Sequence, residues 1–126
     1  MWIKYNANPI SNNVEDCSVP AVSLALDINW DDAFDLVAEM AKNMGVMPHN
    51  NAAWGAVLRR YGFNRAVIPN TCPDCYTAAD FCRDNPRGVF VLGFGTHTAT
   101  VIDGNLYDTW DSSDEIPQYF WYRKER

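Results

Sequence analysis

The dipeptide Asp103-Gly104 constrains the fold more than any other feature, because it lies between two strand-like runs, 96–102 and 105–110. Asp-Gly between such runs predicts a two-residue turn of type I′, which joins antiparallel strands. A turn of that length fixes the register: Ile102 pairs with Asn105, and the pairing continues outward residue by residue. The chain is therefore expected to contain a β-hairpin whose facing side chains can be named from the sequence.

This register brings His97 and Asp108 to the same face of the hairpin. Counting outward from the turn pairs Ala99 with Asp108 and His97 with Trp110, so His97 and Asp108 are diagonal cross-strand neighbours. Such residues have backbones ~7–8 Å apart, a gap that an imidazole and a carboxylate can span. A slip of one residue would bring Asp111 opposite His97, but it would also mix the threonines of the strand with its apolar residues. We therefore expect Asp108 to be the partner of His97.

Cys17 lies at the start of a predicted helix over 19–26, directly after Asp16, which can cap it. The partial positive charge at a helix N-terminus favours the thiolate, which is the nucleophilic form of cysteine. With His97 as the general base and Asp108 as the group that orients it, Cys17 would complete a cysteine–histidine catalytic site. The candidate donors of an oxyanion hole are the backbone N–H of Cys17 and the side-chain amides of Asn12 and Asn13.

The rest of the chain indicates one domain, 1–126, with helices first and strands second. Three further helices are expected: 29–45 with the apolar stripe Phe34, Val37, Met40, Ala41 and Met44; 51–61 with Trp54, Val57, Leu58 and Tyr61 inward; and 77–85, opened by a capping box of Thr77 and Asp80. Strands are expected over 63–68, 88–94, 96–102, 105–110 and 118–123, and a solvated turn over 111–114. This order predicts an α+β fold in which N-terminal helices pack on a C-terminal antiparallel sheet.

Charge and hydropathy exclude several classes of function. The net charge of −6 argues against nucleic acid as the main partner, because phosphate binding relies on clustered lysine and arginine. No segment approaches the ~18 apolar residues that a membrane span requires. The N-terminus lacks the basic and apolar regions of a signal peptide, so we expect a cytoplasmic protein. Nothing in the sequence predicts a cofactor or an oligomeric state.

The remaining cysteines support a competing interpretation. Cys72 and Cys75 form a CxxC pair, and Cys82 follows on the next predicted helix. A structural zinc needs four ligands, so His49 or a group from outside the chain would have to complete the set. A redox dithiol would need βαβ surroundings, which the order of elements does not supply. In the absence of metal, these residues are expected to be reduced cysteines that flank a turn and pack against one face of a helix.

The order cysteine, histidine, aspartate resembles that of the papain-like cysteine peptidase superfamily, in which the cysteine opens the first helix and the other two lie on adjacent strands. Asp16-Cys17 and the histidine-bearing strand that leads to Asp108 are similar to the bacteriocin-processing branch. Asp16-Cys17-Ser18 is similar to the cell-wall amidases of the NlpC/P60 type, and 107–112 resembles small papain-like proteins of phages and gut bacteria. The resemblance implies a papain-like fold in a bacterial or phage-infected cell. It also implies hydrolysis of a peptide or protein substrate through a thioester, with Cys17, His97 and Asp108 as the triad.

Two positions differ from the pattern of these families. Ser18 and Val19 occur where a glycine usually follows the nucleophile, and the upstream glutamine is replaced by Ser11, Asn12 or Asn13. These differences favour an alternative function on the same fold, namely a catalytically weak or inactive binding module, such as a phage protein that engages a host protein.

Overall fold

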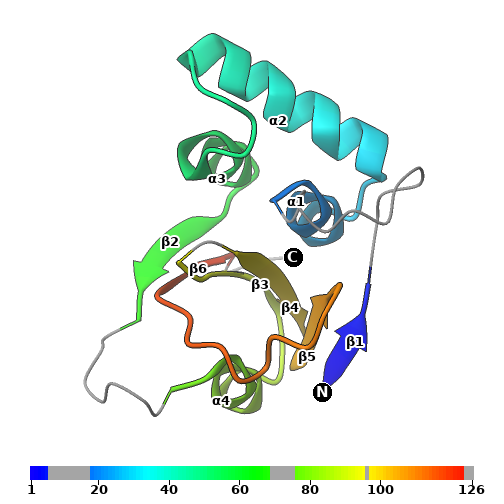
Figure 1. Ribbon diagram of the computed structural model, residues 1–126, viewed down its shortest axis with the longest axis vertical. Helices are drawn as coiled ribbons and strands as arrows, with labels where there is room; N and C mark the ends of the chain where they lie inside the picture. Colours follow the sequence, from blue (N-terminus) through cyan, green and yellow to red (C-terminus); the bar gives the residue numbers. More distant parts are fainter. Residues whose placement is uncertain (6–17, 69–75, 96, 124–126) are drawn as a thin grey trace.

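The computed structural model of the protein describes residues 1–5, 18–68, 76–95 and 97–123. They form a sheet with helices on both of its faces (Figure 1). The helices are α1 (Ser18–Leu26), α2 (Trp30–Met44), α3 (Asn51–Arg60) and α4 (Ala78–Asp84). The strands are β1 (Trp2–Lys4), β2 (Asn64–Val67), β3 (Val89–Gly93), β4 (Thr98–Ile102), β5 (Asn105–Asp108) and β6 (Tyr119–Tyr122). The predicted α+β class is therefore confirmed.

The sheet has the strand order β1-β5-β4-β3-β6-β2. Neighbouring strands are antiparallel except at one edge, where β1 runs parallel to β5 with Trp2 opposite Leu106. The prediction of an antiparallel, C-terminal sheet is right for four of the five strand pairs, but the sheet is mixed, because β1 from the start of the chain joins it in parallel. A parallel pair needs no tight turn between its strands, so β1 can pair with a strand far along the chain.

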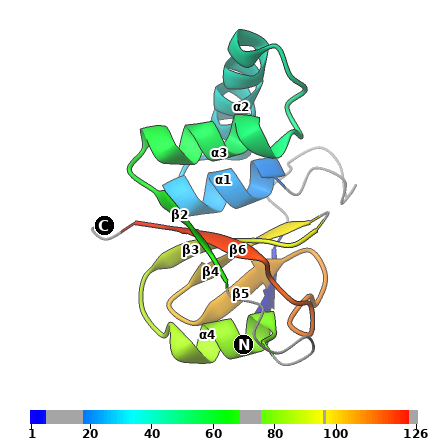
Figure 2. The same ribbon diagram turned by 90° about the vertical axis from the view of Figure 1, so that its left-hand side faces the viewer.

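The helices are divided between the two faces of the sheet (Figures 1 and 2). On one face, α1, α2 and α3 enclose an apolar core that includes Val89 and Val91 of β3. On the other face, α4 packs Phe81 against Leu92 of β3 and Val101 of β4. Side chains alternate along a strand, so each central strand contributes to both cores.

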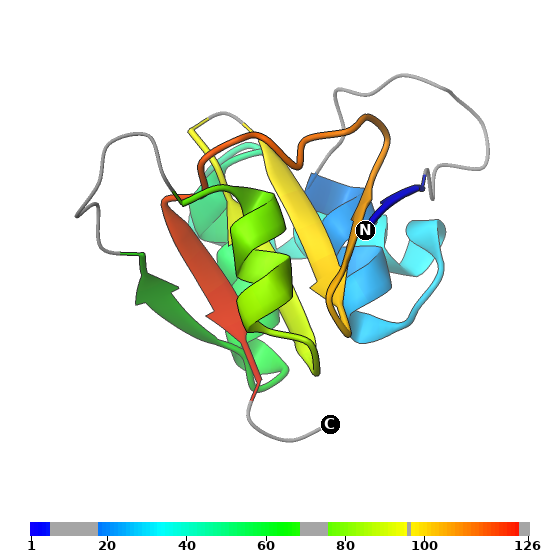
Figure 3. The ribbon, with the colours of Figure 1, turned by 90° about the horizontal axis from the view of Figure 1, so that it is seen from below.

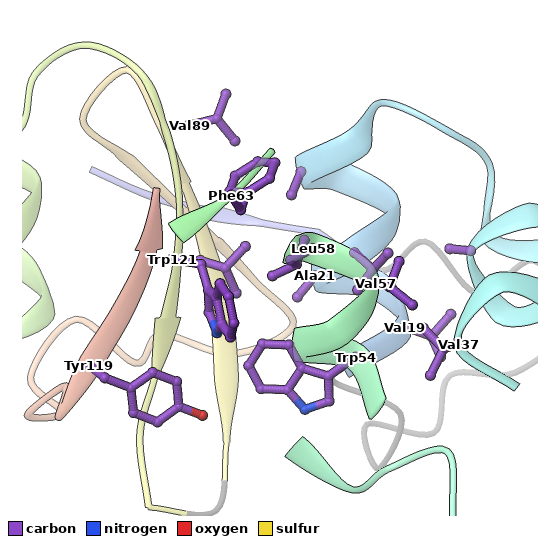
Figure 4. Close-up of a cluster of buried hydrophobic side chains, with 14 residues drawn as sticks. Val19, Ala21, Val37, Trp54, Val57, Leu58, Phe63, Val89, Tyr119 and Trp121 are labelled. Carbon is purple, nitrogen blue, oxygen red and sulfur yellow. The ribbon is translucent and has the colours of Figure 1, made fainter. Parts of the chain in front are cut away.

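Within the larger core, α3 and strand β6 contribute two tryptophans that pack together (Figure 4). Trp54 of α3 and Trp121 of β6 meet in an edge-to-face arrangement, with their ring centroids 6.4 Å apart. The indole N–H of Trp54 donates to Oδ1 of Asn51 at 3.0 Å, so its polar atom is satisfied at the rim of the core. Gly55 permits the close approach of α3, because a Cβ at that position would lie 2.8 Å from the Trp121 ring. Aromatic packing thus fixes α3 on β6.

The predicted caps of α2 and α4 are confirmed, whereas Asp16, the predicted cap of α1, lies outside the described residues. At the start of α2, Oδ1 of Asn29 accepts a hydrogen bond from the Asp32 N–H at 2.8 Å, and Gly45 ends the helix with φ of 73°. At the start of α4, Thr77 and Asp80 form the expected reciprocal capping box, with bonds of 3.0 and 3.2 Å. These signals are local, so the sequence alone specifies them.

Three side chains expected in the core are exposed. Phe34 and Met44 of α2 are 41% and 44% exposed, while Val37 and Ala41 on the same helix are buried. α2 packs chiefly on α1 and α3 rather than on the sheet, so only a narrow strip of its surface is covered. Tyr61 is 43% exposed because α3 ends at Arg60, which leaves Tyr61 in the following turn. None of the helices in the described residues is long and apolar enough to cross a membrane.

Candidate active site

The β4–β5 hairpin has the register predicted from the sequence. Asp103 and Gly104 have φ of 50° and 79°, as a type I′ turn requires. The pairs that follow the turn are Ile102 with Asn105, Val101 with Leu106, and Thr100 with Tyr107. The strands therefore end with His97 directly before β4 and Asp108 as the last residue of β5.

His97 and Asp108 are in direct contact, as the register predicts. Nε2 of His97 lies 2.5 Å from Oδ2 of Asp108, and the two side chains are 14% and 5% exposed. An ionised carboxylate can only accept hydrogen bonds, so this contact fixes the imidazole with a proton on Nε2. In the neutral ring, Nδ1 is then the basic nitrogen, which is the atom that could remove a proton from a nucleophile.

The Asp108 carboxylate is held by two further donors. The hydroxyl of Ser112 donates to Oδ2 at 2.6 Å, and the backbone N–H of Thr109 donates to Oδ1 at 2.7 Å. Ser112 is completely buried, so the expectation that all of 111–114 forms a solvated turn is wrong at this residue. The sequence offers no sign that distinguishes Ser112 from Ser113, because its burial depends on the contact with Asp108.

Asp111, the alternative partner of His97, belongs to the surface. Its Oδ1 accepts hydrogen bonds from the hydroxyl and the backbone N–H of Ser113, at 2.5 and 3.1 Å. These hydrogen bonds, that from the Ser113 side chain first, lower the pKa of the Asp111 carboxyl. The preference for Asp108 over Asp111 is therefore confirmed.

Two aromatic rings lie against the His97 imidazole. The Phe94 ring is stacked with its centroid 5.9 Å away, and the Trp110 ring is tilted by 36° at 5.1 Å. Phe94 is buried and belongs to the core beneath α4, whereas Trp110 is 42% exposed. The imidazole is thus supported from the protein interior and partly covered by an exposed indole.

The helix that follows Cys17 packs on the other face of this hairpin. The hydroxyl of Thr100 donates to the backbone oxygen of Ala21 in α1 at 3.1 Å, whereas Ala99 and Val101 face α4. Because side chains alternate between the two faces of a strand, His97 lies on the same face as Ala99 and Val101, the face that α4 covers. However, α1 and β4 both begin at the same end of the sheet (Figures 2 and 3). A group at the start of α1 could therefore meet the His97–Asp108 pair around the end of the sheet, rather than across one of its faces.

The other predicted members of the site lie outside the described residues. These are the nucleophile Cys17 and the oxyanion donors Asn12 and Asn13. Ser18, joined to Cys17 by one peptide bond, opens α1 and is buried, as is Val19. Between α1 and strands β4 and β5, beside Asp108, the remaining space amounts to about 20 Å³, room for one water molecule.

The proposed zinc ligands are also described only in part. Cys72 and Cys75 lie outside the described residues, so a zinc site remains a prediction. Cys82 is a free, buried cysteine on α4, and burial raises the pKa of its thiol. Within 1–5, 18–68, 76–95 and 97–123, no three His, Cys, Asp or Glu side chains gather closely enough to hold a metal ion.

In chemical terms, the described residues bring together a histidine and a carboxylate that orients its ring. A histidine whose tautomer is fixed by a buried carboxylate can accept a proton at one nitrogen and later return it to a leaving group. When the chain is compared with known proteins, no protein-family model, curated protein or solved structure matches it.

Proposed function

We propose that the protein is a papain-like cysteine hydrolase, a peptidase or amidase with Cys17 as nucleophile, His97 as general base and acid, and Asp108 as the orienting carboxylate. The observation that carries the proposal is the contact between His97 and a buried, hydrogen-bonded Asp108 at the end of the sheet where α1 begins. Cys17 is joined to the first residue of that helix, so the proposal requires its sulfur to reach Nδ1 of His97.

The proposed reaction has two stages. Nδ1 of His97 takes the thiol proton of Cys17, and the thiolate attacks the carbonyl carbon of a peptide or isopeptide-type amide. The C–N bond breaks, the amine leaves with the proton from His97, and a thioester remains on Cys17. A water molecule, deprotonated by His97, then attacks the thioester and releases the carboxylic acid and the free thiol. During both attacks the Cys17 N–H and the amide of Asn12 or Asn13 would stabilise the oxyanion.

The surroundings of the dyad support this role. Asp108 remains close to His97 because Ser112 and Thr109 hold both of its oxygens, and its burial strengthens its attraction for an imidazolium. The substrate we propose is a peptide or protein, and the compartment is the cytoplasm of a bacterial or phage-infected cell.

The reactivity of Cys17 provides the direct test. Native protein is treated with iodoacetamide at neutral pH, and the labelling rate of each cysteine is followed by peptide mass spectrometry. We expect Cys17 to react faster than Cys72, Cys75 and Cys82, and His97→Ala to slow Cys17 by about tenfold or more. His49→Ala is the matched control, since His49 is exposed in a loop. Equal rates for all four cysteines, or an unchanged rate in His97→Ala, would rule out the catalytic role.

One observation favours a second candidate, a non-catalytic binding module. The space between α1 and the hairpin beside Asp108 holds no more than about one water molecule, and the first two residues of α1, Ser18 and Val19, are buried. In this case His97 and Asp108 would serve only to stabilise the end of the sheet. The labelling experiment separates the two candidates, because a binding module gives Cys17 no dependence on His97.

A further inference from the structure

Positive charge is concentrated in one part of this acidic protein. The chain carries a net charge of −6, yet the segment between Met40 and Pro73 contains no aspartate or glutamate. The same segment contains Lys42, Arg59, Arg60 and Arg65. It includes α3 and the edge strand β2, so the charged side chains of these two elements are all cationic.

Two of these arginines lie over aromatic rings of β6. The guanidinium carbon of Arg59 is 5.3 Å from the ring centroid of Trp121, and that of Arg65 is 4.3 Å from the ring centroid of Tyr119. Among the described residues, the ion pairs involve other side chains, so neither arginine is neutralised by a carboxylate of this region. Stacking on a ring orients a guanidinium while leaving its N–H donors available to an anion.

The arginines border a groove between α3 and the outer strands of the sheet, which we name the α3–β2 groove. It has a volume of about 430 Å³ and is lined by Arg59, Arg65, Tyr119, Trp121 and small residues of α3 that include Ala52 and Gly55. The Tyr119 and Trp121 rings project from β6 toward α3 (Figure 4). The groove therefore has an aromatic base and two cations at its rim.

The outer edge of β2 adds unpaired backbone groups to this groove. β2 is the last strand of the sheet, and no strand in the described part of the chain pairs with its outer side. The Ile68 N–H donates to the backbone oxygen of Gln118 at 2.9 Å. This bond makes Ile68 and Gln118 a hydrogen-bonded pair. Hydrogen-bonded and non-hydrogen-bonded pairs alternate in an antiparallel ladder, so the N–H and C=O groups of Arg65 and Val67 point away from β6.

The register also fixes which side chains accompany those backbone groups. Arg65 is paired with Trp121, and Val67 with Tyr119, and directly paired residues share a face of the sheet. The side chain of Val67 is 65% exposed, which leaves an apolar site beside the cationic one. A strand added to β2 would therefore meet backbone donors and acceptors, one exposed valine and two arginines.

We propose that the α3–β2 groove binds an extended acidic peptide segment of a partner protein. The segment adds to the sheet as a strand beside β2, hydrogen-bonded to Arg65 and Val67, and its carboxylate side chain lies between the guanidinium groups of Arg59 and Arg65. A nucleic acid could use the arginines but not the strand edge, and the acidic remainder of the protein would repel its phosphates. This site is separate from the His97–Asp108 pair and does not depend on catalysis.

Synthetic peptides test the proposal on the full-length protein. The probe is fluorescein-labelled acetyl-Thr-Val-Glu-Val-Glu-Val-Thr-amide, and binding is followed by fluorescence anisotropy. One control peptide carries lysine in place of both glutamates, and a second carries N-methylated backbone nitrogens on alternate residues, which removes its donors on one edge. We expect saturable binding of the acidic peptide alone. Arg59→Gln and Arg65→Gln should each weaken it by about tenfold, and the matched control Arg87→Gln, on the loop after α4, should not.

Several results would overturn the proposal. No saturable binding of the acidic peptide, equal binding of the lysine peptide, or equal binding of the N-methylated peptide would each exclude strand addition guided by the arginines. Displacement of the peptide by a single-stranded oligonucleotide at lower concentration would indicate a nucleic-acid site instead. Circular dichroism verifies that each variant is folded. His97→Ala should bind the peptide normally, so failure of this proposal and failure of the hydrolase proposal are distinguishable.

Discussion

The hydroxyl of Ser112 donates to Oδ2 of Asp108, the same oxygen that contacts Nε2 of His97. Ser112 thus occupies one lone pair of that oxygen and leaves another directed at the imidazole. Because Ser112 is fully buried, water cannot substitute for it without a local opening of the loop after β5. The orientation of the dyad therefore depends on a third residue, which holds the carboxylate of Asp108 in place.

Replacing Ser112 by alanine should destabilise both the protein and the dyad. A buried carboxylate that loses a charge-assisted hydrogen bond costs about 2 kcal/mol in the free energy of unfolding, measured by urea denaturation. The rate of Cys17 alkylation should also fall, because the carboxylate no longer holds the imidazole. Ser113→Ala is the control, since the Ser113 hydroxyl donates to the exposed Asp111, and its loss should cost ~0.5 kcal/mol or less. Equal costs for the two variants would contradict this account of Ser112.

Cys82 should react slowly with alkylating agents in the native protein. It is 5% exposed in the core beneath α4, and burial raises the pKa of its thiol, so little thiolate is present at neutral pH. Unfolding in urea should increase its labelling rate by about tenfold or more. The rate is measured by mass spectrometry of the Cys82 peptide in the same reactions that report on Cys17. Equally fast labelling in native protein would indicate that α4 does not cover this side chain.

Replacing Gly55 by alanine should destabilise the protein, although alanine is the better helix former. The new Cβ would lie 2.8 Å from the Trp121 ring, and forcing the ring away costs about 1–3 kcal/mol. The control is Ala56→Gly at the next position, which tests helix propensity alone and should cost about 1 kcal/mol. Thermal and urea unfolding would measure both. A gain in stability for Gly55→Ala would mean that α3 is not in close contact with Trp121.

The capping box of α4 should contribute to the acid sensitivity of the protein. The hydrogen bond from the Thr77 backbone N–H contributes most to lowering the pKa of the Asp80 carboxyl, and the Thr77 hydroxyl and Arg83 lower it further. A lowered folded-state pKa gives stability that is fully present above the unfolded pKa and is lost as the pH falls through the folded value. In Asp80→Asn the unfolding midpoint should therefore decline less steeply below about pH 4 than in the unaltered protein. Asp35→Asn, at an exposed position of α2, controls for the loss of one charge. If the unfolding midpoint of all three proteins changed identically with pH, the capping box would not contribute to acid sensitivity.

Features with short-range causes were predictable from the sequence. The caps at Asn29 and Thr77 and the hairpin at Asp103-Gly104 each depend on neighbouring residues, and the hairpin register in turn predicted the His97–Asp108 contact. Strand β1 was missed because three residues carry too short a pattern, and its parallel pairing with β5 depends on the folded sheet. Helical spacing likewise identifies a stripe on α2, but only the position of α2 outside α1 and α3 determines that Phe34 and Met44 remain exposed.

The parallel pairing of β1 with β5 has a consequence for the order of folding. Trp2–Lys4 leaves the ribosome long before its partner Asn105–Asp108, because helices α1 to α4 and strands β2 to β4 lie between them in the chain. Closing so long a stretch of chain is entropically slow, so β1 should dock after the hairpin has formed. During synthesis, β1 therefore remains without its partner until the β4–β5 hairpin has formed. In that interval the apolar side chains of Trp2 and Ile3 lack the neighbours that β5 gives them in the folded sheet.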